Sequence, residues 1–272
     1  MTSEASVLAV ANQKGGVGKT TTVINLGAYL AELGQRVLLV DLDPQANVTS
    51  GLGFDKGAIA SSVYEAIVGE VGLADAVLHT TQPSLDLVPS ALRLAGAEVE
   101  MVGLMAREQR LARVLRPLLP DYDFVLIDCS PSLGLLTVNA LTAATGVLIP
   151  IQCEYLALEA LGQLLNTVSL IRDNLNPRLH VFGIVMTMYD ARTNLSQQVV
   201  EEVRSHFPDL IFSAVVPRNV RLSEAPSYGR SIFAYDPASR GAQAYRALAV
   251  EVVARRETQA PESEGNHSHR AI

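Results

Sequence analysis

The chain has 272 residues, of which 49% are hydrophobic, so it is long enough to bury a core and too apolar to be disordered. Its net charge of −7 argues against coating a nucleic acid with the whole surface, although a local basic patch remains compatible with it. No apolar run reaches the roughly 20 residues of a membrane-spanning helix and the start of the chain lacks a signal-peptide pattern, so we expect a cytoplasmic protein.

Short apolar runs alternate along the chain with longer segments of helical pattern. The predicted strands are 7–11, 37–41, 85–89, 124–128, 147–151, 181–187 and 211–216. The predicted helices are 19–33, 62–68, two pieces within 93–118, 134–143, 155–175, 195–206 and 238–256. This alternation predicts an α/β fold with a single doubly wound, mostly parallel sheet and helices on both faces. We assign residues 1–256 to this domain, and 257–272, which are polar and without periodicity, to a disordered tail.

A glycine-rich segment between the first predicted strand and the first helix carries phosphate-binding chemistry. Residues 12–22 read Asn-Gln-Lys-Gly-Gly-Val-Gly-Lys-Thr-Thr-Thr. At such a turn, backbone N–H groups and the positive end of a helix converge on one point, which suits the phosphates of a nucleotide. We expect Lys19 to bind phosphate through its ammonium group, Thr20 to bind Mg²⁺ and Thr21 to contact the α-phosphate. The backbone amides of the loop come from Gly15, Gly16, Val17 and Gly18.

The loop departs from the usual G-x-x-x-x-G-K-[ST] pattern, because Gln13 replaces its first glycine and Lys14 follows. Two ammonium groups about 4 Å apart would repel by several kcal/mol, so we expect that only a bound polyanion compensates Lys14 and Lys19. Lysine occurs at just three positions of the chain, 14, 19 and 56. Because Lys19 already serves the nucleotide of its own subunit, we predict that Lys14 acts on the phosphate bound by a second subunit.

Polar side chains stand at the ends of several predicted strands. Ligands of parallel sheets lie beyond the carboxyl ends of the strands, where Lys14, Asp41, Asp43, Asp128 and Gln152 all fall. Asp128 ends an apolar run, the arrangement in which a carboxylate holds a magnesium-bound water. Asp41 and Asp43 share one face of their strand, so the sequence does not choose between them as the group that orients the attacking water.

These segments resemble a known family. The sequence Lys-Gly-Gly-Val-Gly-Lys-Thr is the deviant Walker A loop of the ParA/MinD group of P-loop NTPases. Further segments resemble the ParA/Soj partitioning ATPases, namely 37–45 (VLLVDLDPQ), 127–134 (IDCSPSLG), 151–155 (IQCEY), 190–194 (DARTN) and 217–227 (PRNVRLSEAPS). The likeness covers about 7–254. Ala46 and Ser130 depart from it, where the family usually has Gly and Pro.

The resemblance implies a Mg²⁺-dependent ATPase that partitions DNA. ATP would drive the formation of a homodimer that binds non-specific double-stranded DNA of the nucleoid, and a ParB/Spo0J-type protein would stimulate hydrolysis and release. No membrane contact is implied.

The resemblance also implies roles for individual residues. Asp43 would orient the attacking water, with Lys14 and Lys19 as the catalytic lysines, while Asp41 would join Thr20 and Asp128 around Mg²⁺, Asp128 through water. Adenine contacts would fall on Pro217 and Asn219, and DNA contacts on Arg192, Arg218, Arg221 and Arg230.

Other classes of protein share parts of this pattern. A metabolic ligase of the dethiobiotin or cobyrinate-amidating type has the same phosphate loop but would act without DNA. A non-catalytic ATP-gated DNA-binding scaffold would have no need of Asp43 and Asp128. A nitrogenase-type iron protein needs cysteines in Gly-rich settings, whereas Cys129 and Cys153 lie in apolar runs and are expected to be buried. Attachment to a membrane in the manner of MinD would need a basic amphipathic C-terminal segment, which 257–272 do not provide.

Overall fold

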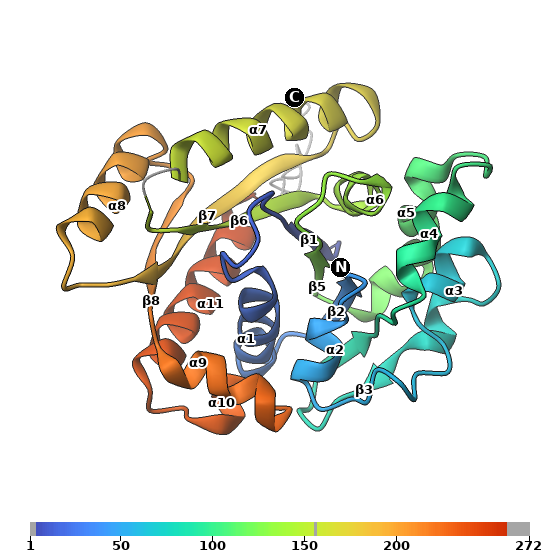
Figure 1. Ribbon diagram of the computed structural model, residues 1–272, viewed down its shortest axis with the longest axis horizontal. Coiled ribbons are helices and arrows are strands. Elements are labelled where there is room, and N and C mark those ends of the chain that lie inside the picture. Colours follow the sequence, from blue (N-terminus) through green and yellow to red (C-terminus); the bar gives the residue numbers. More distant parts are fainter. Residues whose placement is uncertain (1–3, 155–156, 260–272) are drawn as a thin grey trace, which may run out of the picture.

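The computed structural model describes residues 4–154 and 157–259 of the chain (Figure 1). Within these residues one eight-stranded sheet has the order β3 (Leu78–His79), β4 (Leu85–Val88), β2 (Val37–Leu42), β5 (Phe124–Cys129), β1 (Ser6–Val10), β6 (Gly146–Gln152), β7 (His180–Tyr189), β8 (Ile211–Pro217). All neighbouring strands are parallel except β3 and β4. The predicted fold class, a single mostly parallel sheet with helices on both faces, is confirmed.

The strands at the centre of the sheet are buried on both faces. In β1, Leu8 and Val10 contribute to one hydrophobic cluster while Val7 and Ala9 contribute to the other. One cluster is covered by α1 (Lys19–Glu32), α2 (Asn47–Gly51), α9 (Val220–Glu224), α10 (Ile232–Tyr235) and α11 (Arg240–Gln259). The other is covered by α3 (Val63–Val68), α4 (Leu94–Met101), α5 (Arg110–Leu115), α6 (Leu135–Ala143), α7 (Ala157–Asn174) and α8 (Asn194–His206). Figure 1 shows these layers, with α7 on one side of the sheet and α1 and α11 on the other.

The predicted elements are present, and the elements that were missed are short. β3 is a two-residue antiparallel edge strand in which Leu78 pairs with Leu87, too short for any periodic signal. α2, α9 and α10 are four or five residues long and were not predicted either. The segment 93–118 contains α4 and α5 as two pieces. Short 3₁₀ turns lie at Leu73–Ala76, Arg107–Gln109, Arg116–Asp121 and Ala225–Tyr228.

The first helix ends where the sequence pattern indicates, whereas the last helix extends further than predicted. α1 stops at Gly34, which has a φ of +83° and donates its N–H to Ala31 O at 3.0 Å. α11 continues to Gln259, beyond the predicted boundary at 256, and the rest of the predicted tail, 260–272, lies outside the described residues. No helix of the described residues combines the length and the apolar character that crossing a membrane requires.

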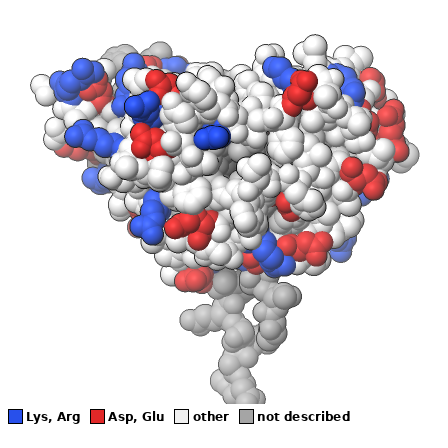
Figure 2. All heavy atoms as spheres, turned by 90° about the horizontal axis from the view of Figure 1, so that it is seen from below, with Lys and Arg blue, Asp and Glu red and all other residues white. Residues whose placement is uncertain are grey.

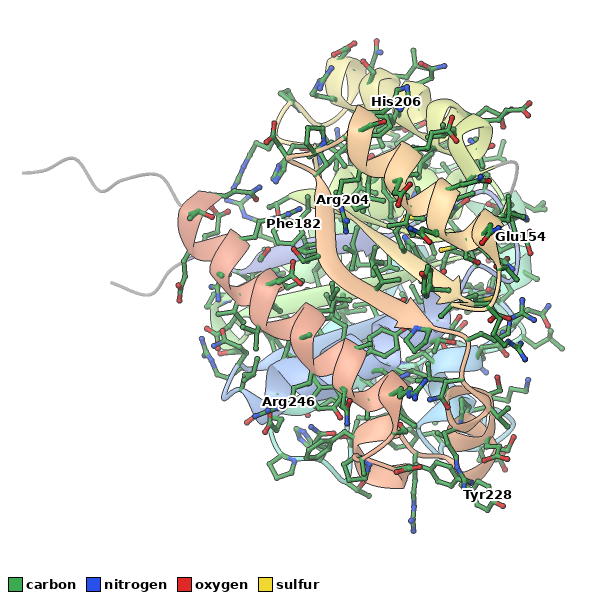
Figure 3. All side chains as sticks on the ribbon, turned by 90° about the vertical axis from the view of Figure 1, so that its left-hand side faces the viewer. Glu154, Phe182, Arg204, His206, Tyr228 and Arg246 are labelled. Atoms are coloured by element: carbon green, nitrogen blue, oxygen red, sulfur yellow. The ribbon has the colours of Figure 1, made fainter. Side chains whose placement is uncertain are left out.

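Because the strands of the main sheet run parallel, the loops that follow them gather at one edge. The loop after β1 contains Lys14, the loop after β2 contains Asp43, and the loop after β6 contains Glu154. In Figure 3 the arrowheads of β7 and β8 point toward the side on which Glu154 lies. The fold therefore brings the strand-end residues of the sequence to one place.

Candidate nucleotide-binding site

The loop between β1 and α1 has the backbone of a phosphate cradle. Gly16 and Gly18 have φ values of +76° and +89°, a left-handed conformation that strains residues with a Cβ. Gly18 caps α1 without a side-chain hydrogen bond, and the first turn of α1 contains no acidic residue. The first amides of α1 therefore have no anion from their own helix, and they suit an external one.

Two side chains that the sequence analysis did not single out hold this loop in place. Thr187 Oγ1, at the end of β7, lies 2.8 Å from Val17 O and 3.1 Å from Ile151 O. Asn12 donates through Nδ2 to Pro150 O at 2.8 Å and accepts from Lys14 N at 2.9 Å. These bonds fix the phosphate loop to β6 and β7. The sequence signal that could have identified Thr187 was a polar residue inside an otherwise apolar strand.

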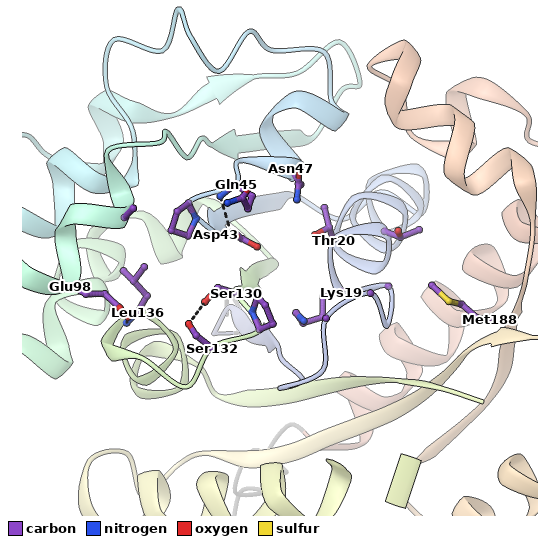
Figure 4. Close-up of a pocket in the computed structure, with 17 residues that line it drawn as sticks. Lys19, Thr20, Asp43, Gln45, Asn47, Glu98, Ser130, Ser132, Leu136 and Met188 are labelled. Carbon is purple, nitrogen blue, oxygen red and sulfur yellow. Dashed lines mark hydrogen bonds between the residues drawn. The ribbon is translucent and has the colours of Figure 1, made fainter. Parts of the chain in front are cut away.

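Two adjoining cavities lie over the loop (Figure 4). The larger, of about 560 Å³, is lined by Gly15, Gly16, Gly18, Lys19, Thr20 and Thr21 together with the loops after β2 and β5. The smaller, of about 400 Å³, is lined by Pro217 and Asn219 among others. They share Gly18, Thr21 and Met188, so together they form one elongated site of the size that small ligands occupy. Most of the residues predicted to bind the phosphates line the larger cavity, and the two residues predicted to contact adenine line the smaller one.

The two lysines of the loop have separate partners. Lys19, only 7% exposed, donates to Lys14 O at 3.0 Å, and burial lowers its pKa against the opposing effect of Asp128. The Lys14 ammonium lies 2.6 Å from Glu154 Oε2, both side chains being nearly half exposed. Gln152 donates to the other oxygen of Glu154. The expectation that only a bound polyanion compensates Lys14 is wrong, because Glu154 does so within this chain.

Asp128 lies at the bottom of the site. It is fully buried, its Oδ2 accepts from Thr20 Oγ1 at 2.7 Å, and its Oδ1 has no hydrogen-bond partner among the described residues. Asp41 pairs with it in register across β2 and β5. Burial first, and then the charge of Asp41, raise the pKa of Asp128 well above its ordinary value. This buried carboxylate is therefore suited to binding a cation beside Oδ1.

Asp41 and Asp43, which the sequence could not separate, occupy different places. Asp41 Oδ2 accepts from Thr49 N at 2.8 Å and Thr49 Oγ1 at 2.7 Å, and burial raises the pKa of Asp41 to about 6. Asp43 lines the larger cavity, and its Oδ1 accepts from Gln45 N at 2.9 Å. Asp41 is not among the residues that line either cavity described above.

The loop after Asp43 contains a strained residue. Ala46 has a φ of +53°, a left-handed conformation that costs a residue with a Cβ about 1–2 kcal/mol. Its N–H donates to Asp43 O at 2.9 Å, which closes the turn that presents Asp43. A positive φ at this position is a physical reason for the glycine that the family resemblance implied there.

The donor atoms at the bottom of the site suit Mg²⁺. They are oxygens, from the Thr20 hydroxyl and the unpartnered Oδ1 of Asp128, and Mg²⁺ prefers oxygen ligands while keeping several waters. The described residues contain no group of three or more His, Cys, Asp or Glu side chains that could hold a metal ion. The ion would accordingly depend on phosphate and water for the rest of its shell.

The four arginines predicted to contact DNA lie around β7, β8 and α9, outside the larger cavity. Arg192 pairs with Asp190, with Nη2 2.7 Å from Oδ2, and Arg221 pairs with Glu224 at 2.9 Å. Arg218 and Arg230 are exposed, and no salt bridge to either is found in the described part of the chain. Figure 2 shows basic side chains more frequent on its left half, with acidic ones among them.

Comparison with known proteins places this site in a family. A family model described as an AAA domain matches residues 5–181. The chain is 56% identical to the sporulation initiation inhibitor protein Soj of Bacillus subtilis, over 91% of this chain and 98% of that protein. It is 51% identical to the chromosome partitioning protein ParA of Caulobacter vibrioides, over 92% and 94%. A solved structure titled cobyrinic acid a,c-diamide synthase from Mycobacterium smegmatis, with an ATP analogue and magnesium, matches with a TM-score of 0.82 at 42% identity, covering 93% of this chain and 96% of that one.

The sheet, the phosphate loop and the strand-end aspartates define a P-loop ATPase. More closely, the chain belongs to the ParA/Soj family of partitioning ATPases, as its sequence motifs predicted.

Replacing Asp128 by Asn should separate activity from stability. We expect Mg²⁺-dependent ATP hydrolysis to fall by about 100-fold or more, because an oxygen anion is lost beside the phosphates. Without Mg²⁺ and nucleotide, the free energy of unfolding should rise by about 1 kcal/mol, since a buried and poorly compensated carboxylate is removed. Steady-state hydrolysis and urea denaturation measure the two effects.

The matched control is Asp86→Asn on β4, where the carboxylate accepts from Tyr122 OH at 2.8 Å and lines neither cavity described above. This control should leave hydrolysis unchanged. Normal Mg²⁺-dependent turnover by Asp128→Asn would contradict the role given to Asp128.

Proposed function

We propose that this ATPase partitions DNA by forming an ATP-dependent dimer in which Lys14 of each subunit completes the site of the other. The observation that carries the proposal is the position of Lys14. Although it belongs to the phosphate loop, it lines neither of the two cavities described above, and its side chain is nearly half exposed beside Glu154. A cation at the rim of one site is placed to approach an anion bound by a neighbour.

The chemistry within one site is hydrolysis of the terminal phosphate of ATP. Lys19 and the amides of Gly15 to Gly18 hold the phosphates, and Thr21 contacts the α-phosphate. Asp43 orients the attacking water through a carboxylate whose position is fixed by Gln45 N. Thr20 and Asp128 would hold Mg²⁺, Asp128 through water, and Asp41 lies in register with Asp128 on the neighbouring strand. The ion when bound would neutralise charge on the phosphates. Pro217 and Asn219 hold adenine in the smaller cavity.

Binding to non-specific DNA follows from the arginines around β8 and α9. Each subunit offers a few phosphate contacts, and joining two subunits multiplies the affinity without new chemistry. Two of the four arginines are already paired with acids, which keeps the single subunit a weak binder. We infer that the dimer resides on the nucleoid in the cytoplasm, and that a ParB/Spo0J-type protein stimulates hydrolysis and so releases it.

An ATP-dependent amidating ligase is the second candidate, because one similar structure is titled as such a synthase. An enzyme that takes ammonia from glutamine commonly uses a nucleophilic cysteine thiolate. Cys129 and Cys153 are both buried, and burial raises the pKa of each thiol, so neither is a ready nucleophile. The identity to partitioning proteins is also higher, at 51–56% against 42%.

The two partners of the Lys14–Glu154 pair should have opposite effects on dimerisation: loss of Lys14 should prevent it, and loss of the Glu154 charge should strengthen it. Lys14→Ala should stay monomeric at saturating Mg²⁺-ATP, because nothing then bridges to the neighbouring phosphate. Glu154→Gln should dimerise about two- to thirtyfold more tightly, since each of the two exposed pairs in a dimer is worth about 0.2–1 kcal/mol and would no longer compete for Lys14. Light scattering with ATP and with ADP measures both.

The control for the loss of charge is Glu159→Gln, an exposed residue in the first turn of α7, which should leave dimerisation unchanged. A Lys14→Ala protein that dimerises as the wild type does would refute the assignment.

Replacing Arg218 and Arg230 together by Ala should reduce the salt dependence of DNA binding. Each phosphate contact contributes about −0.9 to the slope of log K against log salt, and the dimer loses four arginines, so we expect the slope to fall in magnitude by about three to four. Asp190→Asn should raise the affinity, because it frees Arg192. Binding of duplex DNA at several salt concentrations in Mg²⁺-ATP tests both variants.

Arg113 and Arg116 are exposed residues on and beside α5 that serve as the matched control pair for this experiment. An unchanged slope in the Arg218/Arg230 double variant would show that these two arginines do not contact DNA. ATP hydrolysis that duplex DNA leaves unaffected would favour the ligase instead.

A further inference from the structure

A carboxylate from α4, Glu98, stands at the end of the larger cavity that lies away from the adenine residues. It lines this cavity with Ser130, Ser132 and Leu136, whereas Met188 marks the end shared with the smaller cavity. Figure 4 shows Glu98 and Leu136 on one side, Met188 on the other, and Lys19 and Thr20 between them. With adenine in the smaller cavity, the third phosphate of ATP, which ADP lacks, would point toward the Glu98 end.

Glu98 caps a helix that is not its own. Its Oε1 accepts from Leu136 N at 3.1 Å, in the first turn of α6. α6 begins after Gly134, which offers no side-chain cap, and its first turn contains no acidic residue. The carboxylate of Glu98 thus satisfies an amide that its own helix leaves without a partner, and it places negative charge at the positive end of α6.

Gly134 makes room for this carboxylate. A Cβ built on Gly134 would collide with Glu98 Oε1, the end of a flexible side chain. The backbone of Gly134 has a φ of −77° and a ψ of −175°, an extended conformation that any residue adopts. A side chain at this position would therefore displace the Glu98 carboxylate, although the backbone conformation itself would tolerate it.

The start of α6 sets the loop that follows Asp128. Thr137, one turn into α6, donates through Oγ1 to Ser132 O at 2.6 Å, and the hydroxyls of Ser130 and Ser132 lie 2.9 Å apart. Ser130 and Ser132 line the cavity where the third phosphate would lie. A shift of the first turn of α6 would therefore move the loop relative to that phosphate.

We propose that Glu98 is a positioning residue for the terminal phosphate of ATP. By capping α6 it holds the loop 130–134 in the place from which that loop contacts the third phosphate, so ATP binding and hydrolysis depend on it while ADP binding does not. The proposal rests on the ATPase activity of the site and not on DNA binding or on the role of Lys14.

The test compares Glu98→Ala, Gly134→Ala and Glu98→Gln. In the first two variants we expect kcat to fall about tenfold, equal to about 1.4 kcal/mol, and the affinity for a non-hydrolysable ATP analogue to fall while that for ADP stays unchanged. Glu98→Gln should retain wild-type behaviour, because its amide oxygen still accepts from Leu136 N. The double variant Glu98→Ala/Gly134→Ala should be no worse than either single one, since both remove the same contact.

Glu100→Ala on the same helix is the control, because Glu100 bonds to Tyr64 OH at 2.9 Å and lines neither of the two cavities. Thermal unfolding establishes that each variant is folded. Gly134→Ala disturbs the contact between Glu98 and Leu136 N without changing residue 98. Repeating the binding measurements in the Lys14→Ala background separates this proposal from that of the dimer. Equal losses of ATP and ADP binding, or no loss of either, would overturn it.

Discussion

The balance of charge around the phosphate loop is the constraint on which the rest of the site depends. Three aspartates, at 41, 43 and 128, are at most 8% exposed, and Lys19 is the buried ammonium among them. Burial first, and the charge of a neighbouring aspartate after it, raise the pKa values of Asp41 and Asp128. Mg²⁺ would supply the positive charge that the carboxylates lack, and a triphosphate would in turn call for more positive charge than one lysine provides. The site is thus built to gain stability from its ligands.

The same reasoning explains the two positions of the lysines. Lys19 is held inside the site by a backbone carbonyl, which fixes its position without neutralising it. Lys14 is held at the rim by a carboxylate in a pair that is half exposed and therefore weak. A weak pair keeps Lys14 ordered near the edge of the site and yields readily to a more highly charged partner. The nucleotide site and the predicted DNA-binding arginines also meet, because Arg218 is among the residues that line the smaller cavity.

The sequence predicted the sheet and the phosphate loop because both depend on local patterns. Continuous apolar runs such as 124–128 indicate strands buried on both faces. The glycines of the loop indicate a backbone with positive φ values. The sequence could not separate Asp41 from Asp43, because their difference lies in the contact of Asp41 with Thr49, eight residues away. Nor could it pair Lys14 with Glu154 or Glu98 with Leu136, since these contacts depend on how the sheet brings distant segments together. The short helices α2, α9 and α10 are too brief to leave a periodic signal.

The most direct test of the central claim mixes two inactive variants. Lys14→Ala and Asp43→Ala are combined before ATP is added, and ATP hydrolysis is measured. If Lys14 acts on the neighbouring subunit, each mixed dimer contains one complete site, because the Asp43→Ala subunit lends its Lys14 to the Lys14→Ala subunit. We predict that the mixture hydrolyses ATP well above the rate of either variant alone and at no more than about half the wild-type rate, since a mixed dimer has one complete site of two. A mixture as inactive as its separate components would show that Lys14 serves its own subunit, and would contradict the account.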